Sequence, residues 1–404
     1  MKKLPTLALG IVTSIGGFVE AGSISTAAQA GTEFGFALLW AIALAALIVA
    51  MLSEMVGRVA CVSRRSMAAA VRERFGVPFQ LVPLVGEILI DTVLLTAEIG
   101  GAAIALKMLS GIPFPWWILP IAALAWLVLW LGSFGFIEDG VGLLGIITLS
   151  FVVAAWWLQP DAREVARGFV PQLPREHLAR YAFLAVGIVG ATVSPYLLNF
   201  YSSGTIEEKL GEPDLWINRT TAYLGMLLGS VVSMGVLVTA AVVLRPQGVM
   251  ADSYENAALM FKPVFGTWGT VIFALSLGVG CFGAAVEIAL NAGYTLAQSF
   301  GWEWGADKPR RQAVRFTAVF SLMVVVAALI GLTGVDPLQM TQIALALTVV
   351  FMPAIVLPFL VLMNNPAYVK SHRSGPIGNG VLAVLTIAGA IMALVVIPLE
   401  IVGG

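Results

Sequence analysis

The chain has 404 residues and a formal net charge of −1, and 59% of its residues are hydrophobic while only 11% are charged. Soluble globular domains contain about 45–50% apolar and about 25% charged residues, so this composition excludes an ordinary soluble globule. It predicts one membrane domain over residues 1–404, with the lipid bilayer as a partner. The sequence holds no basic tract or nucleic-acid-binding motif, so we expect no nucleic-acid partner.

Eleven apolar stretches are long enough to cross a bilayer, which takes about 20 mostly apolar residues per helix. In chain order they are residues 6–30, 35–57, 79–110, 114–132, 138–158, 180–204, 217–244, 265–299, 314–333, 337–363 and 379–401. If the N-terminus is cytoplasmic, the cytoplasmic segments hold 15 of the 22 Lys and Arg residues. The excess of positive charge inside therefore predicts an inner (plasma) membrane protein with a cytoplasmic N-terminus and an external C-terminus.

The spans divide into two sets of five. Spans one to five cover about 6–158, spans six to ten cover about 180–363, and the helix at about 379–401 is extra. Because five is an odd number, the second set must be inverted relative to the first. This predicts an all-α membrane protein built on a 5+5 inverted repeat.

The first helix of each set carries an interruption. Span one contains Glu20-Ala21-Gly22-Ser23, and an acidic residue beside glycine at mid-membrane depth is costly unless it faces a partner or water. Span six contains Ala191-Thr-Val-Ser-Pro-Tyr196, in which Pro195 removes a helical donor and breaks or kinks the helix. Matched breaks in two inverted halves predict a binding site near the membrane midplane, with unwound backbone near 20–23 and 191–196.

These stretches resemble the Nramp (natural resistance-associated macrophage protein) family of divalent-metal transporters. The resemblance rests on Phe18-Val-Glu-Ala-Gly-Ser-Ile-Ser-Thr-Ala-Ala-Gln-Ala-Gly-Thr-Glu-Phe-Gly35 with Leu38-Leu39-Trp40, on Gly190-Ala-Thr-Val-Ser-Pro-Tyr196 with Tyr201-Ser202-Ser203, on Ala97-Glu98 with Gly100-Gly101-Ala102-Ala103-Ile104 and Lys107, and on Arg310-Arg311 with Arg315. It implies a LeuT-type 5+5 inverted-repeat fold, with helices 1 and 6 broken at the midplane, and transport by alternating access.

The chain departs from the family pattern at the metal-site motifs and at the proton-linked positions. The family has Asp-Pro-Gly-Asn where this chain has Glu20-Ala21-Gly22-Ser23, and Met-Pro-His where it has Ser194-Pro195-Tyr196. The family's third-span Asp is replaced by Leu95, and a sixth-span histidine by Tyr201. Tyrosine titrates near pH 10, so it cannot replace histidine as a proton carrier at neutral pH, and we expect weak or absent proton coupling.

The candidate ligands at the two breaks all offer oxygen. They are the carboxylate of Glu20, the hydroxyls of Ser23 and Ser194, the phenol of Tyr196, the carbonyls of Ala21 and Ala191, and the amide of Gln342, whose position resembles that of the family's metal-facing glutamine. Oxygen ligands suit Mg²⁺ and Mn²⁺, so we expect one of these as the transported substrate, with no cofactor. Because only one carboxylate is placed here, a small organic or monovalent cation paired with Glu20 stays an alternative.

Further acids lie in the third and eighth spans. Glu87, Asp91 and Glu98 fall within about 40° of one another on a helical wheel, so they share one face. Such a stripe is typical of a proton pathway, which could include Tyr201, or of a network paired with the arginines; both interpretations stay open. The arginines concerned are Arg310, Arg311 and Arg315. Glu287 and Asn291, one turn apart, either line the same cavity or form a buried hydrogen-bonded pair.

Enzyme chemistry finds little support in the sequence. The chain has two histidines, both in predicted loops, and no GxSxG, HExxH or CxxC motif, so we expect a transporter rather than an enzyme and see no obligatory protein partner. Cys61 and Cys281 lie in or beside apolar segments, and we interpret both as small apolar packing residues.

Overall fold

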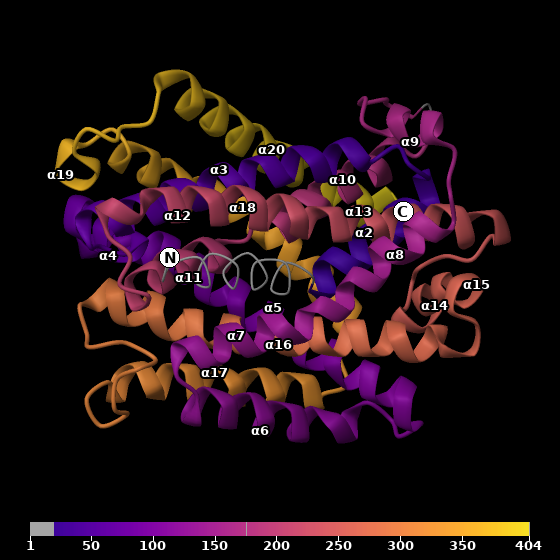
Figure 1. The fold of residues 1–404 in the computed structure, drawn as a ribbon, viewed down its shortest axis with the longest axis horizontal. Helices are drawn as coiled ribbons and strands as arrows, with labels where there is room; N and C mark the ends of the chain where they lie inside the picture. Colours follow the sequence, from indigo (N-terminus) through magenta and orange to yellow (C-terminus); the bar gives the residue numbers. More distant parts are fainter. Residues whose placement is uncertain (1–19, 175, 404) are drawn as a thin grey trace.

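The computed structural model describes residues 20–174 and 176–403, and the regular structure of these residues is helical (Figure 1). The α-helices are α2 (Ala21–Phe34), α3 (Leu39–Ser63), α4 (Met67–Phe75), α5 (Val77–Ser110), α6 (Pro115–Leu131), α7 (Phe134–Gly145), α8 (Ser150–Trp157), α9 (Ala162–Gly168), α10 (Leu178–Thr192), α11 (Pro195–Glu207), α12 (Leu215–Thr220), α13 (Met226–Val243), α14 (Tyr254–Ala258), α15 (Lys262–Phe265), α16 (Gly269–Phe300), α17 (Val314–Leu332), α18 (Pro337–Leu362), α19 (Pro366–Val369) and α20 (Pro376–Gly403). Short 3₁₀ turns are η1 (Ile146–Leu149), η2 (Glu212–Asp214), η4 (Arg245–Gln247), η5 (Leu259–Phe261) and η6 (Gly266–Trp268), and η3 (Thr221–Gly225) is a π-helical turn.

Within the described residues, nine helical segments are long and apolar enough to cross a membrane, and the shorter apolar helix α6 adds a candidate. Each predicted span from 35–57 onward coincides with one of these segments. The first predicted span, 6–30, extends beyond the described residues, and α2 covers its second half. The N-terminal residues 1–19, on which the predicted cytoplasmic N-terminus falls, lie outside the described part of the chain.

The sixth predicted span is broken into two helices, as expected. Helix α10 ends at Thr192 and α11 begins at Pro195, with Val193 and Ser194 non-helical between them. Proline disfavours the helical conformation of the residue before it, and Ser194 is accordingly extended, at φ −92° and ψ 139°. The break is narrower than the predicted 191–196, because the Val193 N–H still donates to the Val189 carbonyl and keeps the preceding turn helical.

The first span departs from helix at Glu20, which is extended at φ −117° and ψ 177°. The prediction of unwound backbone over 20–23 is wrong for residues 21–23, because α2 begins at Ala21. The free N–H of Ala21, one of the four that a helix start leaves unpaired, donates to the Glu98 carboxylate of α5. With that donor satisfied by a side chain, the helix can start directly after Glu20.

Two groups of helices form the centre of the molecule. α5 packs along α16 and α18, while α2 packs along α13 and α10, and these layers meet where α2, α5 and α16 touch. Figure 1 shows α6 and α17 at one edge of this bundle and α20 at the opposite edge. Large apolar side chains on the outer helices face outward, among them Trp116, Leu131 and Trp156, each more than 70% exposed. Such exposure is typical of a lipid-facing surface rather than of a soluble protein.

Candidate functional site

Glu20 and Tyr196 bring the two helix breaks together. Glu20 directly precedes α2, and Tyr196 is the second residue of α11. The Tyr196 hydroxyl donates a 2.8 Å hydrogen bond to Glu20 Oε2, and both side chains are at most 2% exposed. The other carboxylate oxygen, Glu20 Oε1, is buried and has no hydrogen-bond partner among the described residues. One half of a carboxylate is therefore held in place while the other half stays available.

The free oxygen of Glu20 faces a point where α2, α10 and α18 converge. A side-chain carbon built on Gly22 would lie 3.3 Å from Glu20 Oε1, 3.3 Å from Leu345 Cδ2 and 3.5 Å from Ala191 Cβ. Gly190 is also required, because a Cβ there would lie 2.7 Å from the Leu345 carbonyl oxygen. Glycine at these two positions lets the three helices close tightly around the carboxylate.

A second carboxylate, that of Glu98, lies at the same break. Glu98 Oε2 accepts the 3.2 Å hydrogen bond from the Ala21 N–H, and Glu98 Oε1 is buried without a described partner. The side chain is fully buried. The sequence interpretation placed a single carboxylate here and assigned Glu98 to a proton pathway or an ion-pair network. The sequence placed Glu98 on the acidic face of the third span, but it did not show that the start of α2 would donate a hydrogen bond to Glu98.

The remaining predicted ligands differ in whether their oxygens already have a hydrogen-bond partner. Ser194 stands at the N-cap position of α11, but its side chain makes no capping hydrogen bond, and its buried hydroxyl has no partner among the described residues. In a continuous helix the Ala191 carbonyl would accept from residue 195, but Pro195 has no N–H to give. The Ala21 carbonyl, in contrast, lies within α2 and accepts a 3.5 Å hydrogen bond from Tyr254. Ser23 is buried at 4% exposure.

Gln342 does not join Glu20. Its Nε2 donates to Gln29 Oε1 at 3.4 Å. Gln342 lies one turn of α18 before Leu345, the residue near Glu20. Both glutamines line a cavity of about 240 Å³, together with Glu33, Arg180, Asp252 and Asp336. In this cavity Arg180 of α10 donates to both oxygens of Glu33 of α2, at 2.7 to 3.1 Å. An ion pair thus joins α2 and α10, the described halves of the two broken spans that lie on this side of the breaks.

The other two acids of α5 form a separate buried network. Asn199 Nδ2 donates to both oxygens of Glu87, at 2.9 and 2.8 Å. Asn291 Nδ2 donates to Glu87 Oε1 at 2.9 Å and to Asp91 Oδ2 at 3.1 Å, and Thr295 adds a 3.1 Å hydrogen bond to Glu87. All of these side chains are buried. The network joins α5, α11 and α16, and its two acids lie about two and three turns of α5 away from Glu98.

Glu287 and Asn291 do not form the hydrogen-bonded pair that was one of their two interpretations. Asn291 turns toward α5, and Glu287, 4% exposed, makes no hydrogen bond with a described residue. That Glu287 and Asn291 line one cavity stays a prediction.

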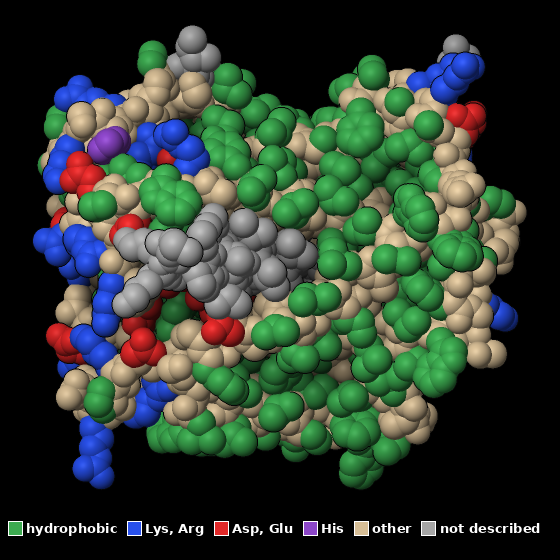
Figure 2. All heavy atoms as spheres, viewed as in Figure 1, with side chains coloured by type: hydrophobic (Ala, Val, Ile, Leu, Met, Phe, Trp, Pro, Cys, Tyr) green, Lys and Arg blue, Asp and Glu red, His purple; other side chains and the backbone are tan. Residues whose placement is uncertain are grey.

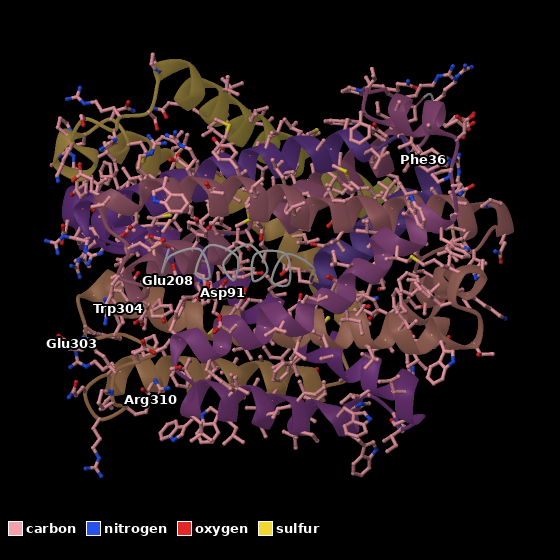
Figure 3. The ribbon with its side chains drawn as sticks, viewed as in Figure 1. Phe36, Asp91, Glu208, Glu303, Trp304 and Arg310 are labelled. Carbon is pink, nitrogen blue, oxygen red and sulfur yellow. The ribbon has the colours of Figure 1, made fainter. Side chains whose placement is uncertain are left out.

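The three arginines do not pair with the acids of α5. Arg310 donates to the carbonyls of Leu129, Trp130 and Gly132 at 2.9 to 3.1 Å, so it caps the end of α6. Arg315 lies over the Trp302 ring at 5.1 Å, and Arg311 is exposed. Figure 3 places Arg310 well apart from Asp91. The ion-pair alternative therefore does not describe this structure.

Tyr201 also lies away from the acids of α5. Its hydroxyl donates to the Asn218 carbonyl at 3.1 Å, and its ring packs against Gly57 of α3. Among the described residues, no group of three or more His, Cys, Asp or Glu side chains is placed to hold a metal ion. A cation at Glu20 and Glu98 would therefore complete its shell with hydroxyls, carbonyls or water.

Comparisons with known proteins agree on one family. The sequence model described as "Natural resistance-associated macrophage protein-like" matches residues 10–399. The chain is 27% identical over 401 residues to the divalent metal cation transporter MntH of Deinococcus radiodurans, covering 95% of this chain and 88% of that protein. It is 30% identical over 371 residues to MntH of Xylella fastidiosa, covering 88% and 77% of the two chains.

Solved structures show the same fold. A manganese transporter of Eremococcus coleocola superposes with a TM-score of 0.78 at 18% identity, over 96% of this chain and 85% of that one. Mhp1, a nucleobase-cation-symport-1 family transporter, superposes with a TM-score of 0.63 at 17% identity, over 96% and 91% of the two chains.

Proposed function

The chain belongs to the natural resistance-associated macrophage protein (Nramp) family, and on that premise we propose that it moves divalent metal cations across the membrane by alternating access, favouring Mg²⁺ or Mn²⁺. It is a multi-pass membrane protein with the LeuT-type inverted-repeat fold, and the members of its family are metal transporters rather than enzymes. We place the two repeats at about 6–158 and 180–363 and the extra helix at about 379–401.

The observation that carries the proposal is the pair of buried carboxylates at the helix breaks. Glu20 and Glu98 each present one buried oxygen without a described partner, and the buried hydroxyl of Ser194 at the other break also lacks one. Two negative charges balance one divalent cation, whereas a monovalent or organic cation would leave one of them buried and uncompensated, at a cost of several kcal/mol. The second carboxylate therefore favours a metal over the organic-cation alternative.

The donor set supports a hard ion. The unpartnered side-chain atoms of Glu20, Glu98 and Ser194 are all oxygens, and carboxylates and hydroxyls suit Mg²⁺ and Mn²⁺. Because no closed cluster of three acidic or nitrogen ligands is present among the described residues, the ion would retain water. Mg²⁺ in particular gives up its water reluctantly and is usually held by one or two carboxylates.

Weak or absent proton coupling is the second part of the proposal. Glu87 and Asp91 are held by amide donors from Asn199 and Asn291, which supports a structural role for the two acids. Tyr201 hydrogen-bonds a backbone carbonyl and lies outside this network.

The charge distribution supports the predicted orientation. Figure 2 shows Lys and Arg gathered at the end of the molecule that carries α4, α12 and α19. Helix α20 ends at Gly403 toward the opposite end. We infer that the basic end is cytoplasmic and that the C-terminus is external, in the plasma membrane. We also infer that transport needs no obligatory protein partner.

Purified protein in liposomes tests the proposal. External Mn²⁺ should enter the vesicles, Mg²⁺ should compete with it at comparable concentrations, and a pH indicator inside should report little acidification. Protein-free liposomes and liposomes with an added ionophore provide the baselines. Strong acidification driven by metal would contradict weak coupling and return Glu87 and Asp91 to a relay role. Uptake of an organic cation without any metal uptake would contradict the metal proposal itself.

A further inference from the structure

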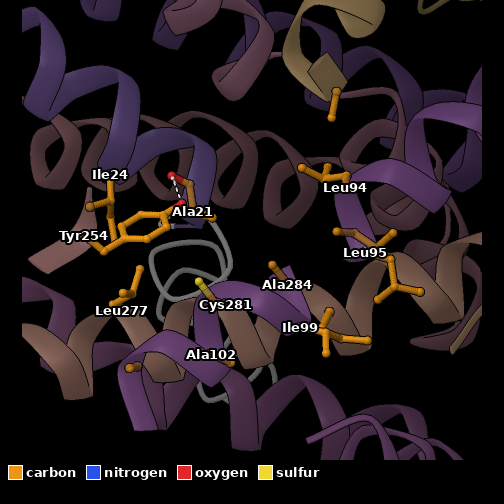
Figure 4. Packing of buried hydrophobic residues seen from close by; sticks show 14 of the residues in the cluster. Ala21, Ile24, Leu94, Leu95, Ile99, Ala102, Tyr254, Leu277, Cys281 and Ala284 are labelled. Carbon is orange, nitrogen blue, oxygen red and sulfur yellow. Dashed lines mark hydrogen bonds between the residues drawn. The ribbon is translucent and has the colours of Figure 1, made fainter. Parts of the chain in front are cut away.

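A thiol lies beside the two carboxylates. Cys281 of α16 is fully buried, and its sulfur and the Ala21 side chain both border Gly101, while the Ala21 N–H donates to the Glu98 carboxylate. A point built as a Cβ on Gly101 would be 2.7 Å from Cys281 Sγ and 3.7 Å from the Ala21 side chain, so the sulfur fills the space that Gly101 leaves open. Figure 4 shows Cys281 on the side of α16 that faces Ala21. The sulfur thus sits at the start of α2.

The surroundings of Cys281 differ from those of an ordinary packing cysteine. A buried thiol usually behaves as a small apolar side chain, and Cys61 does so, packed against Leu210 and Ile217. Cys281 instead lies near carboxylate oxygens that can bind a cation, because Glu98 Oε1 and Glu20 Oε1 are both buried and lack described partners. The interpretation of Cys281 as a packing residue is therefore incomplete.

We propose that Cys281 and Glu98 form a site for thiophilic divalent cations such as Zn²⁺ and Cd²⁺, overlapping the site for the transported ion. The metal bonds to Cys281 Sγ and to Glu98 Oε1, and water completes its shell. As the sulfur–metal bond forms, the S–H bond breaks and its proton is released to water, with no change in oxidation state. The inference rests on the proposed function only in placing the transported ion at Glu20 and Glu98.

This site has a consequence for selectivity. Thiolate favours Zn²⁺ over Mg²⁺ and Mn²⁺, so a thiophilic ion is held more tightly than the transported one. Passage through a membrane protein requires binding that is weak enough for the ion to leave. A thiophilic ion therefore inhibits Mn²⁺ uptake instead of replacing Mn²⁺ as a substrate. The sequence has Ser194 where the resembling family has a methionine, and Cys281 supplies a sulfur from a different helix.

X-ray absorption at the zinc edge tests the bond directly in purified full-length protein loaded with one equivalent of Zn²⁺. Zinc–sulfur bonds are about 2.3 Å and zinc–oxygen bonds about 2.0–2.2 Å, so one sulfur is resolved from the oxygens. Wild-type protein and the Cys61→Ala control should each show one sulfur. Cys281→Ser should show none, and its Kd for Zn²⁺ should rise at least about tenfold, a loss seen even for outer-shell partners of a metal.

A zinc shell without sulfur in the wild type, or a sulfur that persists in Cys281→Ser, overturns the inference. Should Cys281→Ser not yield folded protein, Cys281→Ala replaces it, and Cys61→Ala still decides the matter, since Cys281 is then the one thiol in a chain with two cysteines. Mn²⁺ uptake separates the two proposals. Uptake without a zinc–sulfur bond rejects this inference alone, whereas a zinc–sulfur bond without any Mn²⁺ uptake rejects the transport proposal alone.

Discussion

Replacing Asn291 by leucine should destabilise the protein through Asp91. Asn291 is fully buried, and its amide is the described donor to Asp91 Oδ2, while Asp91 Oδ1 has no described partner at all. Glu87 keeps its hydrogen bonds from Asn199 and Thr295 when Asn291 is lost. Hydrogen bonds to charged groups contribute about 1.5–3 kcal/mol, so Asn291→Leu should lower the free energy of unfolding by about that amount.

A double-mutant cycle with Asp91→Asn isolates this interaction. Removing the charge of Asp91 should make the loss of Asn291 less costly, with a coupling energy of about 1.5–3 kcal/mol between the two positions. Unfolding by titration of a denaturing detergent into mixed micelles gives the four free energies.

Asn218 provides the matched control for this cycle. It is also buried, but its amide donates to the neutral Glu54 carbonyl at 3.0 Å. Asn218→Leu should cost only about 0.5–1.5 kcal/mol and add to Asp91→Asn without coupling. A coupling energy near zero between Asn291 and Asp91 would show that the network does not hold the acid, and the structural role proposed for it would be refuted.

Three further substitutions test separate parts of the structure. Ser194→Met should raise the affinity for Cd²⁺ relative to that for Mn²⁺, because a thioether adds affinity for soft ions; an unchanged ratio of the two Kd values would count against Ser194 as a ligand. Glu33→Gln should weaken the partly exposed ion pair with Arg180, which is worth at most about 1 kcal/mol. Maleimide should then label a Gln339→Cys probe in the 240 Å³ cavity up to about fivefold faster. Equal labelling rates would mean that the ion pair does not hold the cavity closed. Gly190→Ala should lower the free energy of unfolding by about 1–3 kcal/mol, because its Cβ would lie 2.7 Å from a backbone oxygen. The control Gly140→Ala should not lower it, because a Cβ there meets nothing within 4 Å. Similar stability of the two variants would contradict the tight packing of α10 on α18.

The sequence was most informative about local breaks in the chain. Pro195 lacks an N–H wherever it stands, so a break in span six follows from the residue itself, and the structure has it at Val193 and Ser194. The extent of a break depends on tertiary partners, however. Residues 21–23 are helical because Glu98, 77 positions away, accepts the Ala21 N–H, and no local pattern contains that contact.

Side-chain partners across the membrane were harder to predict for the same reason. The helical wheel put Glu87, Asp91 and Glu98 on one face and could not divide them between two sites. Arg310 satisfies carbonyls at the end of α6, since the end of a helix attracts a nearby cation. Cys281 looked like packing in the sequence because its neighbour Glu98 belongs to another helix.

Binding of Mn²⁺ to two glutamine variants tests the central claim most directly. Glu20→Gln and Glu98→Gln each remove one of the two carboxylates, while Tyr196 can still donate to the amide oxygen at position 20. Breaking a buried charge pair costs about 3–5 kcal/mol, so calorimetry should show Mn²⁺ binding weakened by about 10² to 10³·⁵ in each variant.

Glu54→Gln is the control, because Glu54 is a buried carboxylate paired with Arg58 on α3, away from the breaks. It should bind Mn²⁺ as the wild type does. Wild-type affinity in Glu20→Gln or in Glu98→Gln, with the protein folded, would contradict the two-carboxylate site.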